Sequence, residues 1–137
     1  MSAATRDDEG RDASRGEGPR QAGSFFGRRK GHKLRAHQAD LIEHLLPHLA
    51  LDIASPPPAT AAELFDPAAS ALRLEIGFGG GEHLVAEAGT FPDTGFIGCE
   101  PYVNGMAKIL TQIEAADSAL TADRRSSRLR QILLQLE

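Results

Sequence analysis

The chain has 137 residues, one cysteine and a formal net charge of −4 at pH 7. This length suits one modest domain, and a single cysteine excludes an internal disulfide framework. The sequence shows neither an apolar run of membrane-spanning length nor an apolar signal core, so we expect a soluble, cytoplasmic protein in a reducing compartment.

The charge is unevenly distributed along the chain. Residues 1–35 carry nine Lys or Arg and five Asp or Glu, a net of +4, whereas residues 36–137 carry six and fourteen, a net of −8. A basic arm on an acidic body predicts a polyanionic partner that the arm contacts.

Residues 1–23 are rich in charged residues, Gly and Ser and poor in large apolar residues, so we expect a disordered tail. Residues 24–54 form the next unit, a basic segment followed by a helix. Six Lys or Arg and no acid lie between Arg20 and Ala39, and Phe25 and Phe26 offer faces for stacking on bases. This composition fits RNA contacts, and a solvated basic loop remains the alternative.

Residues 36–50 have the clearest helical periodicity, with Pro47 expected to end or kink the helix. His44 and His48 are four residues apart, but no convincing cysteine or carboxylate cluster accompanies them, so we expect surface histidines and no metal site. The apolar stripe of this helix consists of Leu41, Ile42, Leu45, Leu46 and Leu49.

Residues 55–70 begin with Ser-Pro-Pro-Pro and are expected to form a stiff linker, with one helical turn over residues 61–65. Residues 71–137 then form an α/β unit. Its first element is a short apolar run, residues 72–76, which is bounded by glycine and predicts a buried strand.

A glycine cluster follows this strand and precedes a helical segment from Glu82. A dinucleotide-binding turn requires a glycine where Glu82 stands, so that pattern fits poorly. The pattern that fits is acid-x-G-x-G-x-G, formed by Glu75, Gly77, Gly79 and Gly81. It resembles the first motif of class I S-adenosylmethionine-dependent methyltransferases, whose cofactor carries an amino group and a sulfonium that favour a nearby carboxylate. A glycine turn in another α/β protein is the alternative.

A second strand is expected over residues 95–99, with Glu100 at its end, about twenty residues beyond the glycine turn. A carboxylate at this position is placed to accept hydrogen bonds from ribose hydroxyls. Cys99 has no base partner nearby in sequence and is interpreted as a small strand residue. Helices are expected over residues 102–116 and, as a short amphipathic helix, over residues 129–136.

Several stretches together resemble bacterial tRNA (guanine-N7-)-methyltransferases over about Phe25 to Ala116, in the same order and spacing. These stretches read FFGRRKGHKLR, HLLPHL, LRLEIGFGGGEHL and FIGCEPYVNGMAKIL. The resemblance implies a partial Rossmann-like fold with S-adenosyl-L-methionine as methyl donor, a guanine N7 of the tRNA variable loop as acceptor and tRNA as partner. By resemblance, Glu75, Gly77, Gly79, Gly81 and Glu100 contact the cofactor.

The family continues with further strands and a segment that resembles DPWPK-x-RH-x-KRR, which supplies an aspartate and basic residues for the base and tRNA. This chain has no such segment, so no catalytic residue is expected in it. We expect a truncated, frameshifted or internally deleted gene product. A non-catalytic fragment that binds cofactor or tRNA, and a class I methyltransferase with another acceptor, are the alternatives. The sequence does not indicate an oligomeric state.

Overall fold

The computed structural model describes residues 31–118 and 131–136. The expected tail over residues 1–23 and the first part of the basic segment, residues 24–30, lie outside the described residues. The elements in chain order are α1 (Ala36–His44), α2 (Leu46–Leu49), the 3₁₀ helix η1 (Ala61–Leu64), β1 (Ala71–Ile76), α3 (Glu82–Thr90), β2 (Thr94–Cys99), α4 (Val103–Ser118) and β3 (Ile132–Gln135).

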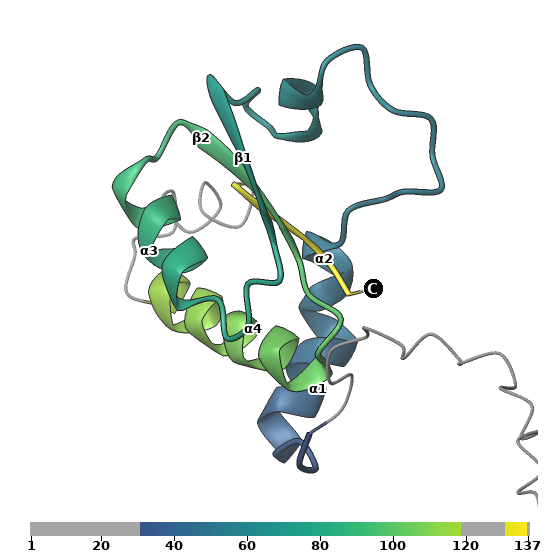
Figure 1. The fold of residues 1–137 in the computed structure, drawn as a ribbon, viewed down its shortest axis with the longest axis vertical. Helices are drawn as coiled ribbons and strands as arrows, with labels where there is room; N and C mark the ends of the chain where they lie inside the picture. The colour runs from purple at the N-terminus through teal and green to yellow at the C-terminus, as the bar shows by residue number, and fades with distance from the viewer. Residues whose placement is uncertain (1–30, 119–130, 137) are drawn as a thin grey trace, which may run out of the picture.

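The described strands form one parallel sheet in the order β1-β2-β3 (Figure 1). Ile76 pairs with Cys99, and Cys99 pairs with Gln135, so the carboxyl ends of the three strands meet at one edge. Helices α3 and α4 lie in the two crossovers, as parallel strands require. The expected α/β class is therefore confirmed, with a partial Rossmann-like arrangement.

One face of the sheet is covered by helices. Phe96, Ile132 and Leu134 point to this face and are buried. They pack in one core with apolar residues of α1, α2, α3 and α4, among which Leu84, Met106, Ile109, Leu110 and Ile113 are buried. The apolar stripes of the helices thus pack against this side of the sheet.

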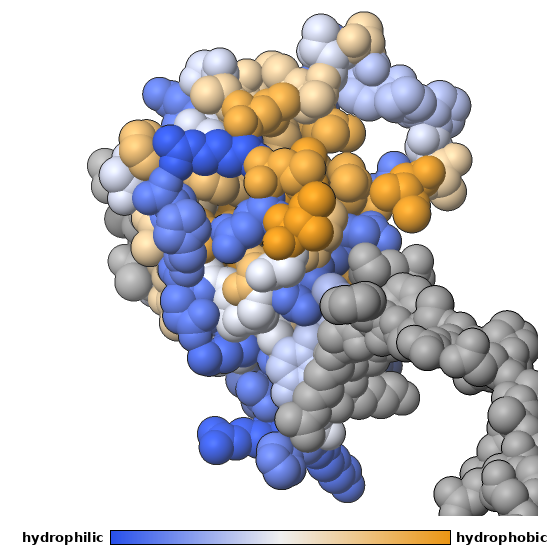
Figure 2. Space-filling model, in the orientation of Figure 1, coloured by the Kyte–Doolittle hydropathy of each residue, from blue (hydrophilic) through white to orange (hydrophobic). Residues whose placement is uncertain are grey.

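The opposite face of β1 is exposed, contrary to the expected buried strand. Leu72, Leu74 and Ile76 are 40%, 62% and 78% exposed. Figure 2 shows apolar side chains gathered on the surface in the region of β1. β1 pairs only with β2 among the described residues. The short η1 contacts β1 but leaves these three side chains exposed. An apolar run indicates a strand, but it does not indicate whether both faces are covered.

Pro47 interrupts the expected helix over residues 36–50, as predicted. α1 ends at His44, and α2 begins at Leu46 with Pro47 in its first turn, where a missing backbone N–H is tolerated. The predicted stripe is confirmed, since Leu41 and Leu49 are buried and Ile42, Leu45 and Leu46 pack against the core. The helical turn expected in the linker is also present as η1.

The expected helix over residues 129–136 is wrong. Residues 132–135 form β3, which pairs in parallel with β2. Ile132 and Leu134 are buried and Leu133 is half-buried, an alternation typical of a strand. The apolar residues of this short segment fit both a helical and a strand period. Pairing with β2, more than thirty residues earlier in the chain, makes the segment a strand.

Candidate functional site at the carboxyl edge of the sheet

A glycine loop, residues 77–81, leaves the carboxyl end of β1 and enters α3. Gly77, Gly79 and Gly81 have φ values of +77°, +61° and +79°, which side chains with a Cβ adopt only at a cost. The Gly77 N–H donates to the Cys99 carbonyl at 2.7 Å, which extends the β1–β2 pairing into the loop. The predicted strand–turn–helix arrangement is therefore present.

Glu100 holds this loop in place. It follows β2, and its side chain lies where the glycine loop passes the end of the sheet. One carboxylate oxygen, Oε2, accepts the Gly79 N–H at 2.6 Å, and the other, Oε1, accepts the Tyr102 N–H at 3.0 Å. Glu100 is only 7% exposed. Its two hydrogen bonds offset the cost of burying a carboxylate.

Helix α4 braces the same loop from the other side. The Gln112 amide donates to the Gly80 carbonyl at 2.6 Å. Gly105 lies against the Gly79 carbonyl so closely that a Cβ on Gly105 would overlap that oxygen, and a Cβ on Gly81 would overlap Ile109. The loop conformation thus depends on contacts from both Glu100 and α4.

Glu75 lies apart from these contacts. Its carboxylate is 3.3 Å from Nδ1 of His83 on α3, and its side chain is 34% exposed. The structure therefore brings Glu100 to the glycine loop, as the parallel strands predict, whereas Glu75 points toward α3.

The sequence did not lead us to expect the two α4 residues that contact the loop, Gly105 and Gln112. Gly105 offered a signal, because glycine inside a helix costs stability and often marks close approach of another backbone. Gln112 offered none, since a glutamine on a helix surface carries no spacing pattern.

The space beside the loop fits a bound cofactor. A Cβ built on Gly77 or Gly79 would meet no heavy atom within 4 Å, so these glycines leave open space where a ligand can approach the backbone. Carboxylates stand on both sides of the loop, Glu75 before it and Glu100 after β2. These carboxylates accept hydrogen bonds, so they suit a ligand with hydroxyl and ammonium groups, not a phosphate.

The expected surface histidines have carboxylate neighbours. His37 Nε2 is 2.6 Å from Glu114 and His44 Nδ1 is 2.9 Å from Asp40, and both histidines are exposed. Within residues 31–118 and 131–136, no three His, Cys, Asp or Glu side chains gather as metal ligands would. No helix in this described part has the length and apolar character needed to cross a membrane.

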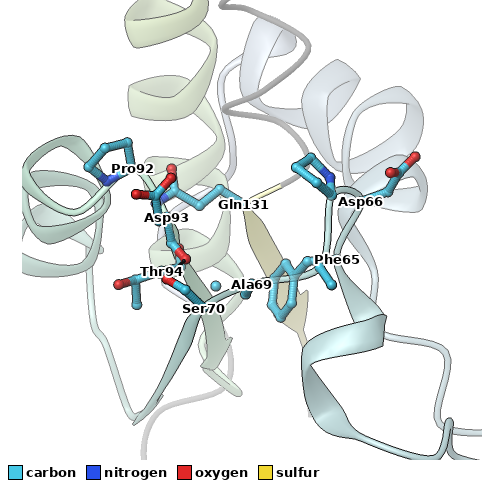
Figure 3. Close-up of a pocket in the computed structure, with 11 residues that line it drawn as sticks. Phe65, Asp66, Ala69, Ser70, Pro92, Asp93, Thr94 and Gln131 are labelled. Atoms are coloured by element: carbon cyan, nitrogen blue, oxygen red, sulfur yellow. Dashed lines mark hydrogen bonds between the residues drawn. The ribbon is translucent and has the colours of Figure 1, made fainter.

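A cavity of about 320 Å³ lies at the opposite edge of the sheet, near the amino ends of β1 and β2. Figure 3 shows Phe65 and Asp66 on one side of it and Asp93, Thr94 and Gln131 on the other. Gln131 donates from Nε2 to the Thr94 carbonyl at 2.7 Å, which ties the chain before β3 to the start of β2. Ligands of open parallel sheets bind at the carboxyl ends of strands, so we interpret this cavity as structural.

Comparison with known proteins identifies the family. A family model described as "Putative methyltransferase" matches residues 69–127, which include the whole glycine loop and Glu100. The chain is 77% identical over 96 residues to a tRNA (guanine-N(7)-)-methyltransferase of Bradyrhizobium diazoefficiens, covering 70% of this chain and 41% of the relative.

Two further relatives carry the same name. One from Rhodopseudomonas palustris is 69% identical over 104 residues, with 76% of this chain and 42% of the relative covered. Another, from Nitrobacter hamburgensis, is 72% identical over 95 residues, with 69% and 37% covered. The chain spans about two fifths of the length of these relatives. Over this portion, the chain belongs to the tRNA (guanine-N(7)-)-methyltransferase family.

Proposed function

We propose that this chain is part of an enzyme that transfers a methyl group from S-adenosyl-L-methionine to N7 of a variable-loop guanine in tRNA. The observation that carries the proposal is the hydrogen bond from the Gly79 N–H to Glu100, which joins the glycine loop to the acid after β2 at the carboxyl edge of the sheet. The names of the relatives support the acceptor.

Different residues of the proposed site contact different parts of the cofactor. Glu100 accepts the ribose hydroxyls. A carboxylate has about four lone-pair sites, of which the Gly79 and Tyr102 N–H groups use two, so capacity for hydroxyl donors remains. Glu75, with Gly77, Gly79 and Gly81, holds the methionine part, because a carboxylate favours the ammonium and sulfonium charges.

The reaction requires little acid–base chemistry. When bound, S-adenosyl-L-methionine supplies an electrophilic methyl group, and guanine N7 carries a lone pair without a proton. The residues of this chain therefore act by holding the cofactor in line with the base and by excluding water. We assign no catalytic residue among residues 1–137.

The partner we propose is tRNA, contacted by the basic segment that contains Arg28, Arg29, Lys30, Lys33 and Arg35. Lys33 and Arg35 lie within the described residues and are exposed, as phosphate contacts require. A cytoplasmic location follows from a tRNA substrate and belongs to the same proposal.

Binding of S-adenosylhomocysteine, measured by calorimetry, tests the cofactor assignment. We expect Glu100→Ala to weaken binding at least about tenfold, since it removes hydrogen bonds to a charged group. Glu63→Ala, an exposed glutamate on η1, is the matched control. Equal affinity of both variants would remove Glu100 from the site.

The acceptor requires a separate assay. Radiolabelled S-adenosyl-L-methionine is offered with a tRNA transcript that contains guanine or 7-deazaguanine, which lacks N7. Label that enters only the guanine transcript supports the proposal. Cofactor binding without label in tRNA would favour a non-catalytic part that binds cofactor, and label in a protein acceptor would favour another class I methyltransferase.

A further inference from the structure

Asn104 clamps the end of the basic segment to the first turn of α4. Its Oδ1 accepts the Gly31 N–H at 2.9 Å, and its Nδ2 donates to the His32 carbonyl at 2.7 Å. Both ends of one side-chain amide thus hold two adjacent residues of backbone more than seventy positions earlier in the chain. Because the contacts are to backbone, they fix the path of this segment whatever its side chains are.

The contact between Gly31 and Asn104 requires a residue without a side chain at position 31. A Cβ on Gly31 would overlap the Tyr102 hydroxyl and approach Asn104 Cγ at 3.1 Å. The segment therefore lies directly on the residues that open α4, and only a residue without a side chain fits between them unless the Tyr102 ring moves.

The same turn of α4 holds the glycine loop. The Tyr102 N–H donates to Glu100, whose other oxygen accepts the Gly79 N–H, and Gly105 lies against the Gly79 carbonyl. Residues 102–105 thus contact the basic segment through Tyr102 and Asn104, and the loop through Gly105 and Glu100. A shift of this turn would disturb both contacts at once.

We propose that Asn104 is a positioning residue that docks the backbone of Gly31 and His32 beside the glycine loop. It thereby couples RNA binding by the neighbouring Lys33 and Arg35 to cofactor binding by the loop. The inference rests on the proposed function for the identity of the two ligands. Cofactor bound to the loop should increase the affinity for RNA. RNA should increase the affinity for the cofactor by the same factor, because such coupling is reciprocal.

Anisotropy of a labelled, unmodified tRNA transcript tests the coupling in the 137-residue chain, with and without saturating S-adenosylhomocysteine. We expect the compound to tighten RNA binding about fivefold in the wild type, at the lower end of typical coupling. Asn104→Ala and Gly31→Ala should reduce this ratio to about one. Thr111→Ala is the matched control and should keep the ratio, because the Thr111 hydroxyl donates to the Ala107 carbonyl within α4.

Asn104→Asp separates positioning from folding. An acid in the first turn favours the helix, so thermal stability should not fall, yet the donor to the His32 carbonyl is lost and the ratio should fall as well. Hydrogen exchange of the Gly31 amide provides a direct readout, which we expect to accelerate about tenfold in Asn104→Ala through loss of its acceptor.

The inference would be overturned if S-adenosylhomocysteine did not change the RNA affinity of the wild type. It would also be overturned if Asn104→Ala showed the same ratio of affinities as the wild type. The proposed function fails differently. If S-adenosylhomocysteine does not bind the wild type at all, the cofactor assignment and the coupling are both wrong. If it binds but does not affect RNA affinity, only the coupling is wrong.

Discussion

At the scale of single residues, Glu82 shows how the end of the glycine loop is stabilised. It is the first residue of α3 and forms an ion pair with Lys108 on α4. The side-chain hydrogen bond from Lys108, together with the Glu82 backbone N–H, lowers the pKa of this carboxyl below its usual 4.5. Both side chains are exposed, so the contribution of the pair to stability is small and sensitive to salt.

This pair predicts a pH-dependent effect of Glu82→Gln on thermal unfolding. A carboxyl whose pKa is lowered by folding adds stability above the unfolded value, and that stability is lost as the pH falls through the folded value. We expect Glu82→Gln to lower Tm at pH 7, and the difference from wild type to shrink as the pH falls below about 4.5. In a Lys108→Met background the effect should be smaller. An effect that does not change with pH would contradict the ion-pair interpretation.

At the scale of elements, α4 supports the candidate site, because it packs on α1 and α3 and contacts the glycine loop. Gly105 is the point of closest approach, against the Gly79 carbonyl. Its lack of a side chain costs the helix some stability but allows the backbone of the loop to pass.

Gly105→Ala should therefore destabilise the protein, although alanine favours helices by about 0.5–1 kcal/mol. Overlap with the loop carbonyl should cost about 1–3 kcal/mol and exceed that gain. Chemical denaturation measures the change, and binding of S-adenosylhomocysteine should weaken with it.

Gly89→Ala is the control for this substitution. Gly89 is an exposed glycine inside α3, so alanine there should be neutral or stabilising. If both substitutions stabilise the protein, the close approach of α4 to the loop is not required.

At the scale of the whole molecule, the two faces of the sheet differ. One face is packed by helices, whereas the other exposes Leu72, Leu74 and Ile76 on β1, whose outer edge is unpaired among the described residues. An exposed apolar edge strand is a template for pairing with another chain.

The double substitution Leu74→Thr, Ile76→Thr tests the consequence of this exposed face. Threonine retains strand propensity, and both side chains are exposed, so unfolding free energy should change by less than about 0.5 kcal/mol. Self-association, measured by sedimentation over a range of concentrations, should decrease. Ile53→Thr, an exposed apolar residue in the segment between α2 and η1, is the control and should have little effect. Unchanged association in the double variant would show that β1 is not the contact surface.

Local patterns in the sequence determined most elements of this protein. The 3.6-residue apolar periods predicted α1 and α4, and Pro47 predicted the break before α2. A helical segment after the glycine cluster predicted α3. The glycine spacing and the acids Glu75 and Glu100 predicted the strand, turn, helix and strand that form the candidate site. These signals are readable because they depend on backbone restrictions of nearby residues and on side-chain periodicity.

Only the tertiary structure decided the features that depend on distant partners. Residues 132–135 became a strand because β2 offers an edge, although their local period also fitted a helix. β1 remained largely exposed because it lies at the edge of the described sheet. The Glu100 carboxylate bonds to the Gly79 N–H, and Asn104 bonds to Gly31, across 21 and 73 positions of chain. Such contacts have no local pattern, because they arise only when the sheet and α4 bring separate segments together.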